Sequence, residues 1–170
     1  MNKGKKIYLL IGPKGSGKSF IGGLLHEHFD ISFLRVEDWV KKIKKGRSVD
    51  DKTYLEEVFN CIEEGVKAGL VEHDCVTFES TGLTSYFDSM LTSLRKDFEV
   101  TTIRINTDPD ICLSRVKSRD QSIHINISDD QVASINQKVC EKNLKCDFAI
   151  DNNSRSVEAL KQELQTILNR

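Results

Sequence analysis

The stretch GPKGSGKS, residues 12–19, lies between an apolar run at residues 6–11 and an amphipathic pattern at residues 18–29. Its three glycines, two lysines and two serines suit neither a packed core nor the interior of a helix. The stretch fits the pattern G-x-x-x-x-G-K-[ST], whose fixed positions are Gly12, Gly17, Lys18 and Ser19. The sequence therefore predicts a phosphate-binding loop between a strand and a helix.

Each residue type in this loop has a chemical reason. Glycines let successive backbone N–H groups turn towards phosphate oxygens, because no Cβ stands in the way. The helix expected to begin near Lys18 offers its N-terminal N–H groups and dipole to the same anion. Lys18 is expected to reach the β- and γ-phosphates, and the Ser19 hydroxyl to ligate Mg²⁺. The pattern predicts that a nucleoside triphosphate binds together with Mg²⁺. We expect ATP, although the sequence does not establish a preference for ATP over GTP. The expected nucleotide contacts in the loop are Gly12, Pro13, Lys14, Gly15, Ser16, Gly17, Lys18, Ser19 and Phe20.

Short runs of β-branched and aromatic residues alternate with longer helical patterns along the chain. The predicted strands cover residues 6–11, 32–36, 75–79, 99–105 and 148–150. The predicted helices cover residues 18–29, 50–69, 84–97, 108–119, 128–143 and 154–170. Such alternation builds a parallel sheet that helices cover on both faces. We therefore expect one α/β domain over residues 1–170, with three α/β/α layers around a five-stranded parallel sheet.

Composition excludes several classes of protein. Hydrophobic residues make up 38% of the chain and charged residues 30%, which is typical of a globular protein. No apolar run approaches the roughly 18 residues that a membrane span needs. A net charge of −1 gives no global electrostatic argument for nucleic-acid binding. The five cysteines are odd in number and widely spaced, so we expect reduced thiols in a cytoplasmic protein. As a separate expectation, the protein is a monomer.

Four stretches resemble the small P-loop kinases of metabolites and nucleotides, a group that includes shikimate, gluconate and 5′-hydroxyl polynucleotide kinases and the zeta-toxin-like enzymes. They are IGPKGSGKS (11–19), FLRVEDWVKK (33–42), CLSRVKSRD (112–120) and FAIDNNSRSVEAL (148–160). The resemblance implies the P-loop NTPase fold of the nucleoside and nucleotide kinases, as a single domain with a small lid. It places an acceptor-binding segment at about residues 38–74 and the lid at about residues 116–130.

In these kinases the second strand ends in an acidic pair that holds the metal or takes the proton of the acceptor. The corresponding residues are Glu37 and Asp38. Phosphoryl transfer needs a carboxylate within hydrogen-bond reach of the attacking hydroxyl, and the carboxyl ends of parallel strands line the ligand crevice. Asp38 is the preferred base and Glu37 its competitor, because alignment to the different families shifts by one residue. Asp38 could instead be only the N-cap of a helix over residues 39–45.

Further along the chain, the resemblance assigns roles to four more residues. Glu79, near the end of the third strand, is expected to order Mg²⁺ together with Ser19, although the relatives carry glycines or Asp-Thr at this place. Arg115 and Arg119 are four residues apart on a predicted helix and so share a face. One arginine would stabilise the transferring phosphoryl group and the other would stack on adenine. Asn152 begins the loop that is expected to hold the adenine.

The leading hypothesis is an ATP- and Mg²⁺-dependent kinase that transfers the γ-phosphoryl group to a hydroxyl of a small-molecule metabolite. The residues expected to act in catalysis are Lys18, Asp38, Glu37 and Arg115. Two alternatives stay open: a 5′-hydroxyl nucleic-acid kinase, and a non-catalytic nucleotide-binding switch that binds a partner. The near-neutral charge argues against a long nucleic-acid footprint but not against binding of one end. The sequence does not name the acceptor.

Overall fold

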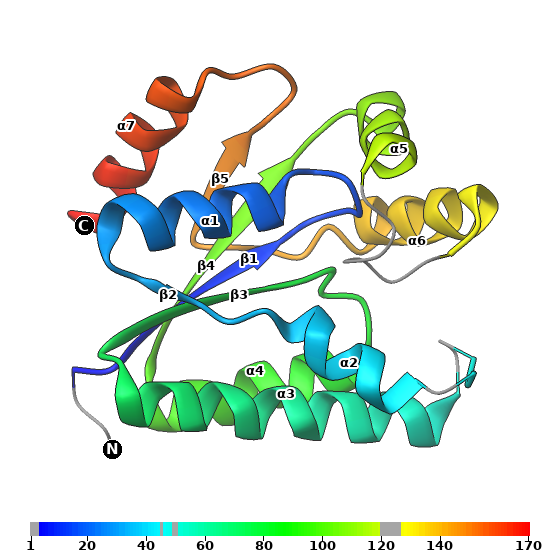
Figure 1. Cartoon of the computed structure of the whole chain (residues 1–170), viewed down its shortest axis with the longest axis horizontal. Coiled ribbons are helices and arrows are strands. Elements are labelled where there is room, and N and C mark those ends of the chain that lie inside the picture. The colour runs from blue at the N-terminus through cyan, green and yellow to red at the C-terminus, as the bar shows by residue number, and fades with distance from the viewer. Residues whose placement is uncertain (1–3, 45, 49–50, 120–126) are drawn as a thin grey trace.

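The computed structural model describes residues 4–44, 46–48, 51–119 and 127–170. Within this part of the chain, five strands form one sheet: β1 (Lys6–Ile11), β2 (Ser32–Phe33), β3 (Cys75–Ser80), β4 (Glu99–Asn106) and β5 (Phe148–Asp151). Their order is β2-β3-β1-β4-β5, and every neighbouring pair is parallel. The predicted α/β class and five-stranded parallel sheet are confirmed (Figure 1).

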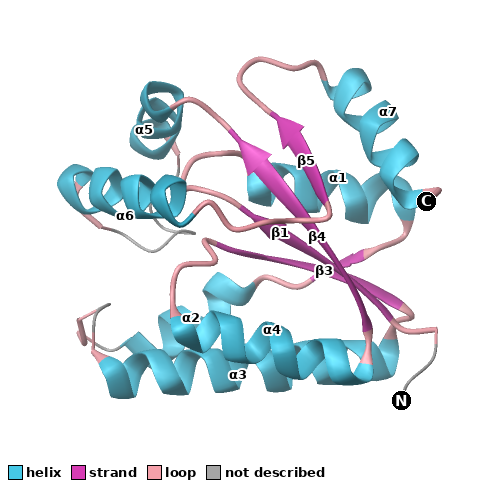
Figure 2. Cartoon of the chain, turned by 180° about the vertical axis from the view of Figure 1, so that it is seen from behind, coloured by secondary structure: helices cyan, strands magenta, loops and turns pink. Residues whose placement is uncertain are grey.

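Helices cover both faces of the sheet, as the alternation of strands and helices requires. The helices are α1 (Lys18–Phe29), α2 (Val36–Lys44), α3 (Lys52–Glu72), α4 (Ser85–Asp97), α5 (Pro109–Ser118), α6 (Asp129–Lys142) and α7 (Val157–Leu168). Figures 1 and 2 show α1 and α7 on one face, and α2, α3 and α4 on the other. None of the helices in the described ranges is long and apolar enough to cross a membrane.

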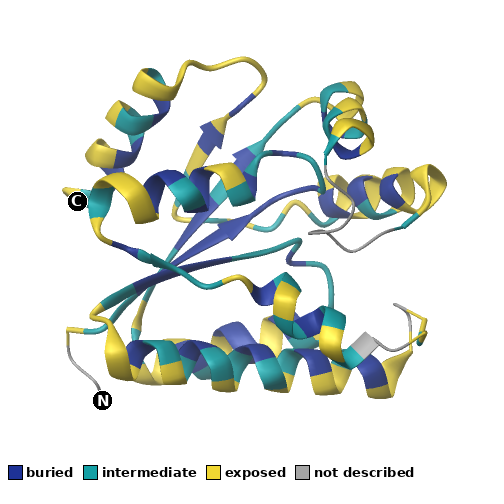
Figure 3. Ribbon diagram, in the orientation of Figure 1, coloured by how far each residue is buried: buried dark blue, intermediate teal, exposed yellow. Residues whose placement is uncertain are grey.

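The buried strand β1 divides its side chains between the two cores. Ile7, Leu9 and Ile11 belong to the hydrophobic cluster that α3 and α4 complete, whereas Tyr8 and Leu10 belong to the cluster with α1 and α7. This follows from the two-residue period of a strand, which sends successive side chains to opposite faces. Figure 3 shows β1 largely buried at the centre of the sheet, and covering helices that carry both buried and exposed residues.

The second strand is shorter than the predicted range 32–36. It pairs with β3 only at Ser32 and Phe33, and the Leu34 N–H continues the pairing with one bond to the Thr77 carbonyl at 2.9 Å. Helix α2 begins at Val36 because its apolar residues Val36, Trp39, Val40 and Ile43 recur at helical spacing and pack on α3. The β-branched residue Val36 was therefore wrongly assigned to the strand. The acidic pair, Glu37 and Asp38, lies in the first turn of α2.

Helices α5 and α6 stand at the carboxyl edge of the sheet, beside the loop that follows β1 (Figure 1). In the predicted lid at about residues 116–130, residues 120–126 lie outside the described residues. The described flanks are the end of α5 and the start of α6, where Ser128 and Gln131 form a capping box. The carboxyl edge of the sheet thus brings the phosphate-binding loop, α5 and α6 together.

Candidate active site

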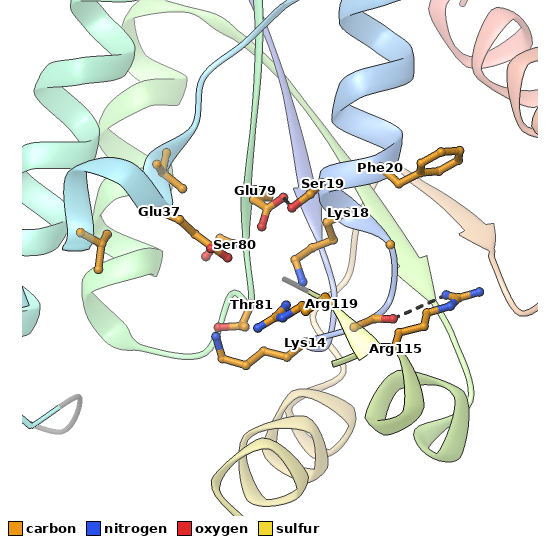
Figure 4. Close-up of a pocket in the computed structure, with 14 residues that line it drawn as sticks. Lys14, Lys18, Ser19, Phe20, Glu37, Glu79, Ser80, Thr81, Arg115 and Arg119 are labelled. Atoms are coloured by element: carbon orange, nitrogen blue, oxygen red, sulfur yellow. Dashed lines mark hydrogen bonds between the residues drawn. The ribbon is translucent and has the colours of Figure 1, made fainter. Parts of the chain in front are cut away.

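A cavity of about 380 Å³ opens at the carboxyl ends of β1 and β3. Eight of the predicted nucleotide-binding residues line it: Lys14, Gly15, Gly17, Lys18, Ser19, Phe20, Arg115 and Arg119. Its opposite wall comes from α2 and from the segment at the end of β3, and Figure 4 shows Glu37, Ser80 and Thr81 on that side of Lys18. Gly12, Pro13, Ser16 and Asn152 are not part of the lining.

The loop needs glycine at two positions where its backbone is left-handed and closely approached. Gly15 has φ 82° and Gly17 has φ 98°, values that favour residues without a Cβ. A Cβ at Gly15 would overlap the Cys112 carbonyl of α5, and one at Gly17 would overlap the Asn152 amide. The loop is therefore packed closely against α5 and against the end of β5, and its curvature is fixed from outside.

The loop leads directly into α1, and this geometry fits a phosphate group. The first hydrogen bond within the helix runs from the Ile21 N–H to the Gly17 carbonyl. The N–H groups of Lys18, Ser19 and Phe20 therefore lie in the first turn, where helices leave such donors for a ligand. Gly17, at the N-cap, has no side chain that could accept from them. These donors and the helix dipole favour an anion at this end of the cavity.

Lys18 lies inside the loop, with only 7% of its surface exposed. Its Nζ donates to the Gly12 carbonyl at 2.9 Å and to the Pro13 carbonyl at 2.8 Å. Burial lowers the pKa of the Lys18 ammonium from its ordinary 10.5 to about 8. The carboxylates of Glu79 and Glu37 raise this pKa, and Lys14 lowers it further. The ammonium is thus held at the cavity with little contact to water, which is why its charged form is less favoured than in solution.

This lowered pKa predicts that nucleotide binding takes up a proton at alkaline pH. Bound phosphates stabilise the ammonium, so a neutral Lys18 must be protonated when they bind. With a pKa of about 8, uptake by Lys18 should rise from about 0.1 proton at pH 7 to about 0.9 at pH 9, and affinity should fall over this range. Calorimetry of MgATP binding in buffers of different ionisation enthalpy measures the uptake. An uptake that stays flat in the wild type, or that rises equally in Lys18→Met, would contradict the assignment.

Ser19 and Glu79 form an oxygen pair beside Lys18. The Ser19 hydroxyl of α1 donates to Glu79 Oε2 of β3 at 2.6 Å, although the two residues are 60 positions apart in the sequence. A hydroxyl and a carboxylate suit Mg²⁺, which prefers oxygen ligands and keeps several of its waters. Figure 4 shows both side chains beside each other, next to Lys18. The structure thus brings together the two residues that the sequence proposed for the metal.

The acidic pair is divided between the cavity and the surface. Glu37 is half-buried in the first turn of α2 and lines the cavity, whereas Asp38 is exposed and does not. Figure 4 shows Glu37 pointing from α2 towards Glu79 and Ser80. Since α2 begins at Val36, Asp38 is also not its N-cap. One helical position, about 100° of rotation, separates the two carboxylates, so the geometry favours Glu37 over the preferred Asp38.

Arg115 connects the phosphate-binding loop with the loop after β5. Its guanidinium donates to the carbonyls of Asn152 and Asn153, each at 2.9 Å, and to those of Gly15 and Ser16 at 3.5 and 3.4 Å. Arg119 follows the last residue of α5 in an extended conformation, so the two arginines do not continue one helical face. Both nevertheless line the cavity.

Asn152 holds the phosphate-binding loop through its buried side chain. Its side chain is 95% buried, and Nδ2 donates to the Ser16 carbonyl at 2.9 Å. Its backbone N–H donates to the Asn106 carbonyl at 2.8 Å, at the end of β4. The observed role of the side chain is thus to hold the phosphate-binding loop, and its place in adenine binding stays a prediction.

Comparison with known families gives a match over most of the chain. The model of the family described as AAA domain matches residues 7–141. The chain belongs to this family. No curated protein sequence matches this member of the AAA-domain family.

Solved structures show the same fold for this AAA-domain chain. Shikimate kinase from Bacteroides thetaiotaomicron is 16% identical and has a TM-score of 0.68, with 98% of this chain and 99% of that chain covered. Shikimate kinase from Acinetobacter baumannii, solved in complex with shikimate, is 17% identical with a TM-score of 0.66 and coverage of 99% and 95%. The Mycobacterium tuberculosis APS kinase, in complex with AMPPNP and APS, is 14% identical with a TM-score of 0.64 and complete coverage of both chains. The fold is that of the small P-loop kinases, which confirms the resemblance drawn from the four sequence stretches.

Two supports of the AAA-domain loop were missed by the sequence analysis. The Thr107 hydroxyl, directly after β4, donates to the Ser16 carbonyl at 3.0 Å. Asn136 of α6 makes two hydrogen bonds to the backbone of Lys14. A signal for Asn136 was present, because it lies four residues after Val132 and three before Val139, on the buried side of an amphipathic helix. A polar residue at such a position needs a partner.

Proposed function

We propose that the protein is an ATP- and Mg²⁺-dependent kinase that transfers the γ-phosphoryl group to a hydroxyl of a small molecule. The observation that carries the proposal is the placement of Glu37 in the same cavity as Lys18 and Ser19. A nucleotide site alone explains the loop, but it gives no reason for a carboxylate on the opposite wall. A kinase needs one there, to take the proton of the attacking hydroxyl.

The described residues divide the work of the reaction. The loop N–H groups and Lys18 bind the phosphates and stabilise the negative charge that the transferring group carries. Ser19 and Glu79 hold Mg²⁺, which neutralises phosphate charge when bound. Arg119 supplies a further cation at the cavity. Arg115 holds the loop and the segment after β5 together by donating hydrogen bonds to carbonyls of both. Glu37 orients the acceptor hydroxyl and accepts its proton at a carboxylate oxygen.

The wall opposite the loop supports a small acceptor with both polar and apolar parts. Val36 and Val40 present apolar surface from α2, and Ser80 and Thr81 present hydroxyls from the end of β3. A cavity of about 380 Å³ shared by the phosphates and the acceptor is in the range for a small ligand rather than a long polymer. The described part of the segment at about residues 38–74 forms most of α2 and all of α3, and its residue on the cavity wall is Val40, which follows Val36 and Glu37 of the same helix.

The proposal is tested by ADP release from MgATP over a panel of acceptors. The panel holds sugar acids, shikimate, nucleosides, phosphorylated alcohols and a 5′-hydroxyl oligonucleotide. We expect acceptor-dependent ADP release with at least one small hydroxyl compound, and a phosphorylated product by mass spectrometry. Turnover confined to the oligonucleotide, with strong salt dependence, would replace the small-molecule assignment by a nucleic-acid kinase. Tight MgATP binding without turnover on any acceptor would favour the nucleotide-dependent switch instead.

A further inference from the structure

Helix α6 reaches the phosphate-binding loop through one buried side chain. The Lys14 N–H donates to Asn136 Oδ1 at 2.7 Å, and Asn136 Nδ2 donates to the Lys14 carbonyl at 2.9 Å. The two bonds connect both backbone polar groups of Lys14, its N–H and its carbonyl, to a residue of α6 that lies 122 positions further along the chain. Asn136 is 93% buried, so few water molecules can replace these bonds.

The residue held in this way occupies a sensitive point of the loop. Lys14 lies between Pro13, which has no backbone N–H, and Gly15, whose φ is 82°. Gly15 is itself pressed against the Cys112 carbonyl of α5. The peptide groups on both sides of Lys14 therefore set the direction in which the following loop N–H groups point. Any rotation there would turn those donors away from the phosphates.

Helix α6 is anchored well enough to act as a fixed support. At its start the Ser128 side chain accepts from the Gln131 backbone N–H in the capping box. At its end Lys142 Nζ donates to the Gly82 carbonyl at 2.7 Å and pairs with Asp88 Oδ1 at 2.9 Å. Val132 and Val139 are buried on the same side of the helix as Asn136. A side chain that projects from an anchored helix positions its partner better than one on a loop.

We propose that Asn136 is a positioning residue, which fixes the Lys14 peptide so that the loop is preformed for the triphosphate before the nucleotide arrives. It acts through the backbone of Lys14 and does not line the nucleotide cavity itself. A loop that is already ordered loses less conformational freedom on binding, which increases affinity without adding a contact. This inference rests on the nucleotide-binding half of the proposed function and not on the identity of the acceptor.

The test is calorimetry of three ligands with the full chain: MgATP, magnesium tripolyphosphate and adenosine. Asn136→Leu keeps the branched shape of the side chain and removes both bonds, so the affinity for MgATP should fall about 10- to 100-fold. The affinity for tripolyphosphate should fall by the same factor, because the lost interaction acts on the phosphates. The affinity for adenosine should change less than twofold. Asn136→Asp keeps the acceptor for the Lys14 N–H, loses the donor and adds a negative charge near the phosphates. Asn136→Asp should therefore weaken the binding of MgATP at least as much as Asn136→Leu does.

Gln137→Leu is the matched control, because Gln137 is the next residue of α6 and is exposed. It should bind all three ligands as the wild type does, and thermal unfolding identifies any variant that fails to fold. Wild-type affinity for MgATP in folded Asn136→Leu would overturn the proposal, as would an equal loss for adenosine and tripolyphosphate. Nucleotide binding by the wild type without turnover would remove the kinase assignment but leave this test of Asn136 intact.

Discussion

Replacing Lys18 with methionine is expected to lower kcat/KM for phosphoryl transfer by about 10³-fold, which is the upper range for removing one preorganised charge donor from a transition state. Lys18 lies inside the loop and lines the cavity, and its ammonium is already desolvated there. In such surroundings an ammonium stabilises developing phosphate charge more strongly than it would in water. The measurement is steady-state ADP release with the acceptor identified by the panel.

The control for Lys18→Met is Lys117→Met, at an exposed position of α5 that pairs with Asp129. This variant should stay within about twofold of the wild type, because exposed ion pairs contribute little. Thermal unfolding of Lys18→Met should remain close to that of the wild type, because two opposing effects follow from the change. The Gly12 and Pro13 carbonyls lose their donor, but a buried charge is also removed. Activity retained within tenfold would show that another group stabilises the phosphates.

The second large effect is expected at Glu37. Glu37→Gln keeps the shape of the side chain but removes the carboxylate, so kcat should fall about 10²- to 10⁴-fold, the range for general-base catalysis. The affinity for MgATP should change little, because the nucleotide is held from the opposite wall of the cavity. Single-turnover transfer and nucleotide binding, measured on the same preparation, separate the two quantities.

Asp38→Asn is the matched control for Glu37→Gln. It makes the same chemical change one residue further along α2, at an exposed position outside the cavity. We expect kcat within about threefold of the wild type, which is the small effect of a surface substitution away from the site. The reverse pattern, with Asp38→Asn inactive and Glu37→Gln active, would restore the sequence-based preference. Transfer that survives both changes would mean that the acceptor's proton leaves by another route.

The sequence predicted the parts of the molecule that local chemistry controls. The glycine pattern at residues 12–19 is specific for a phosphate-binding loop, and the short runs of apolar and β-branched residues in β1, β3 and β4 are typical of parallel strands. The start of α2 was misplaced because Val36 is β-branched and by its own preference favours a strand over a helix. Burial on α3 decides between them, and that information lies outside the segment.

The same boundary bears on the choice between Glu37 and Asp38, which stays a prediction. The helix starts at Val36, one residue before the acidic pair, and turns Glu37 towards the cavity and Asp38 towards solvent, so the position of this boundary decides which carboxylate faces the site. Asn136 and Thr107 were missed because their partners are backbone groups of a loop about 90 to 120 residues away. Only the folded sheet brings α6 and the end of β4 to that loop. Their residue types alone predict a need for partners, not which partners.

The position of β1 in the sheet has a consequence for the order in which the molecule is assembled. β1 comes first among the described strands, yet it is central, and its neighbours β3 and β4 begin at Cys75 and Glu99. Both of its pairings therefore close long stretches of chain, which makes folding slow relative to domains built from local contacts. During synthesis the phosphate-binding loop leaves the ribosome before β3 and β4, so it has no sheet to project from until they have followed. Until then the apolar β1 remains exposed, so we expect nascent chains that stop before Cys75 to depend on chaperones.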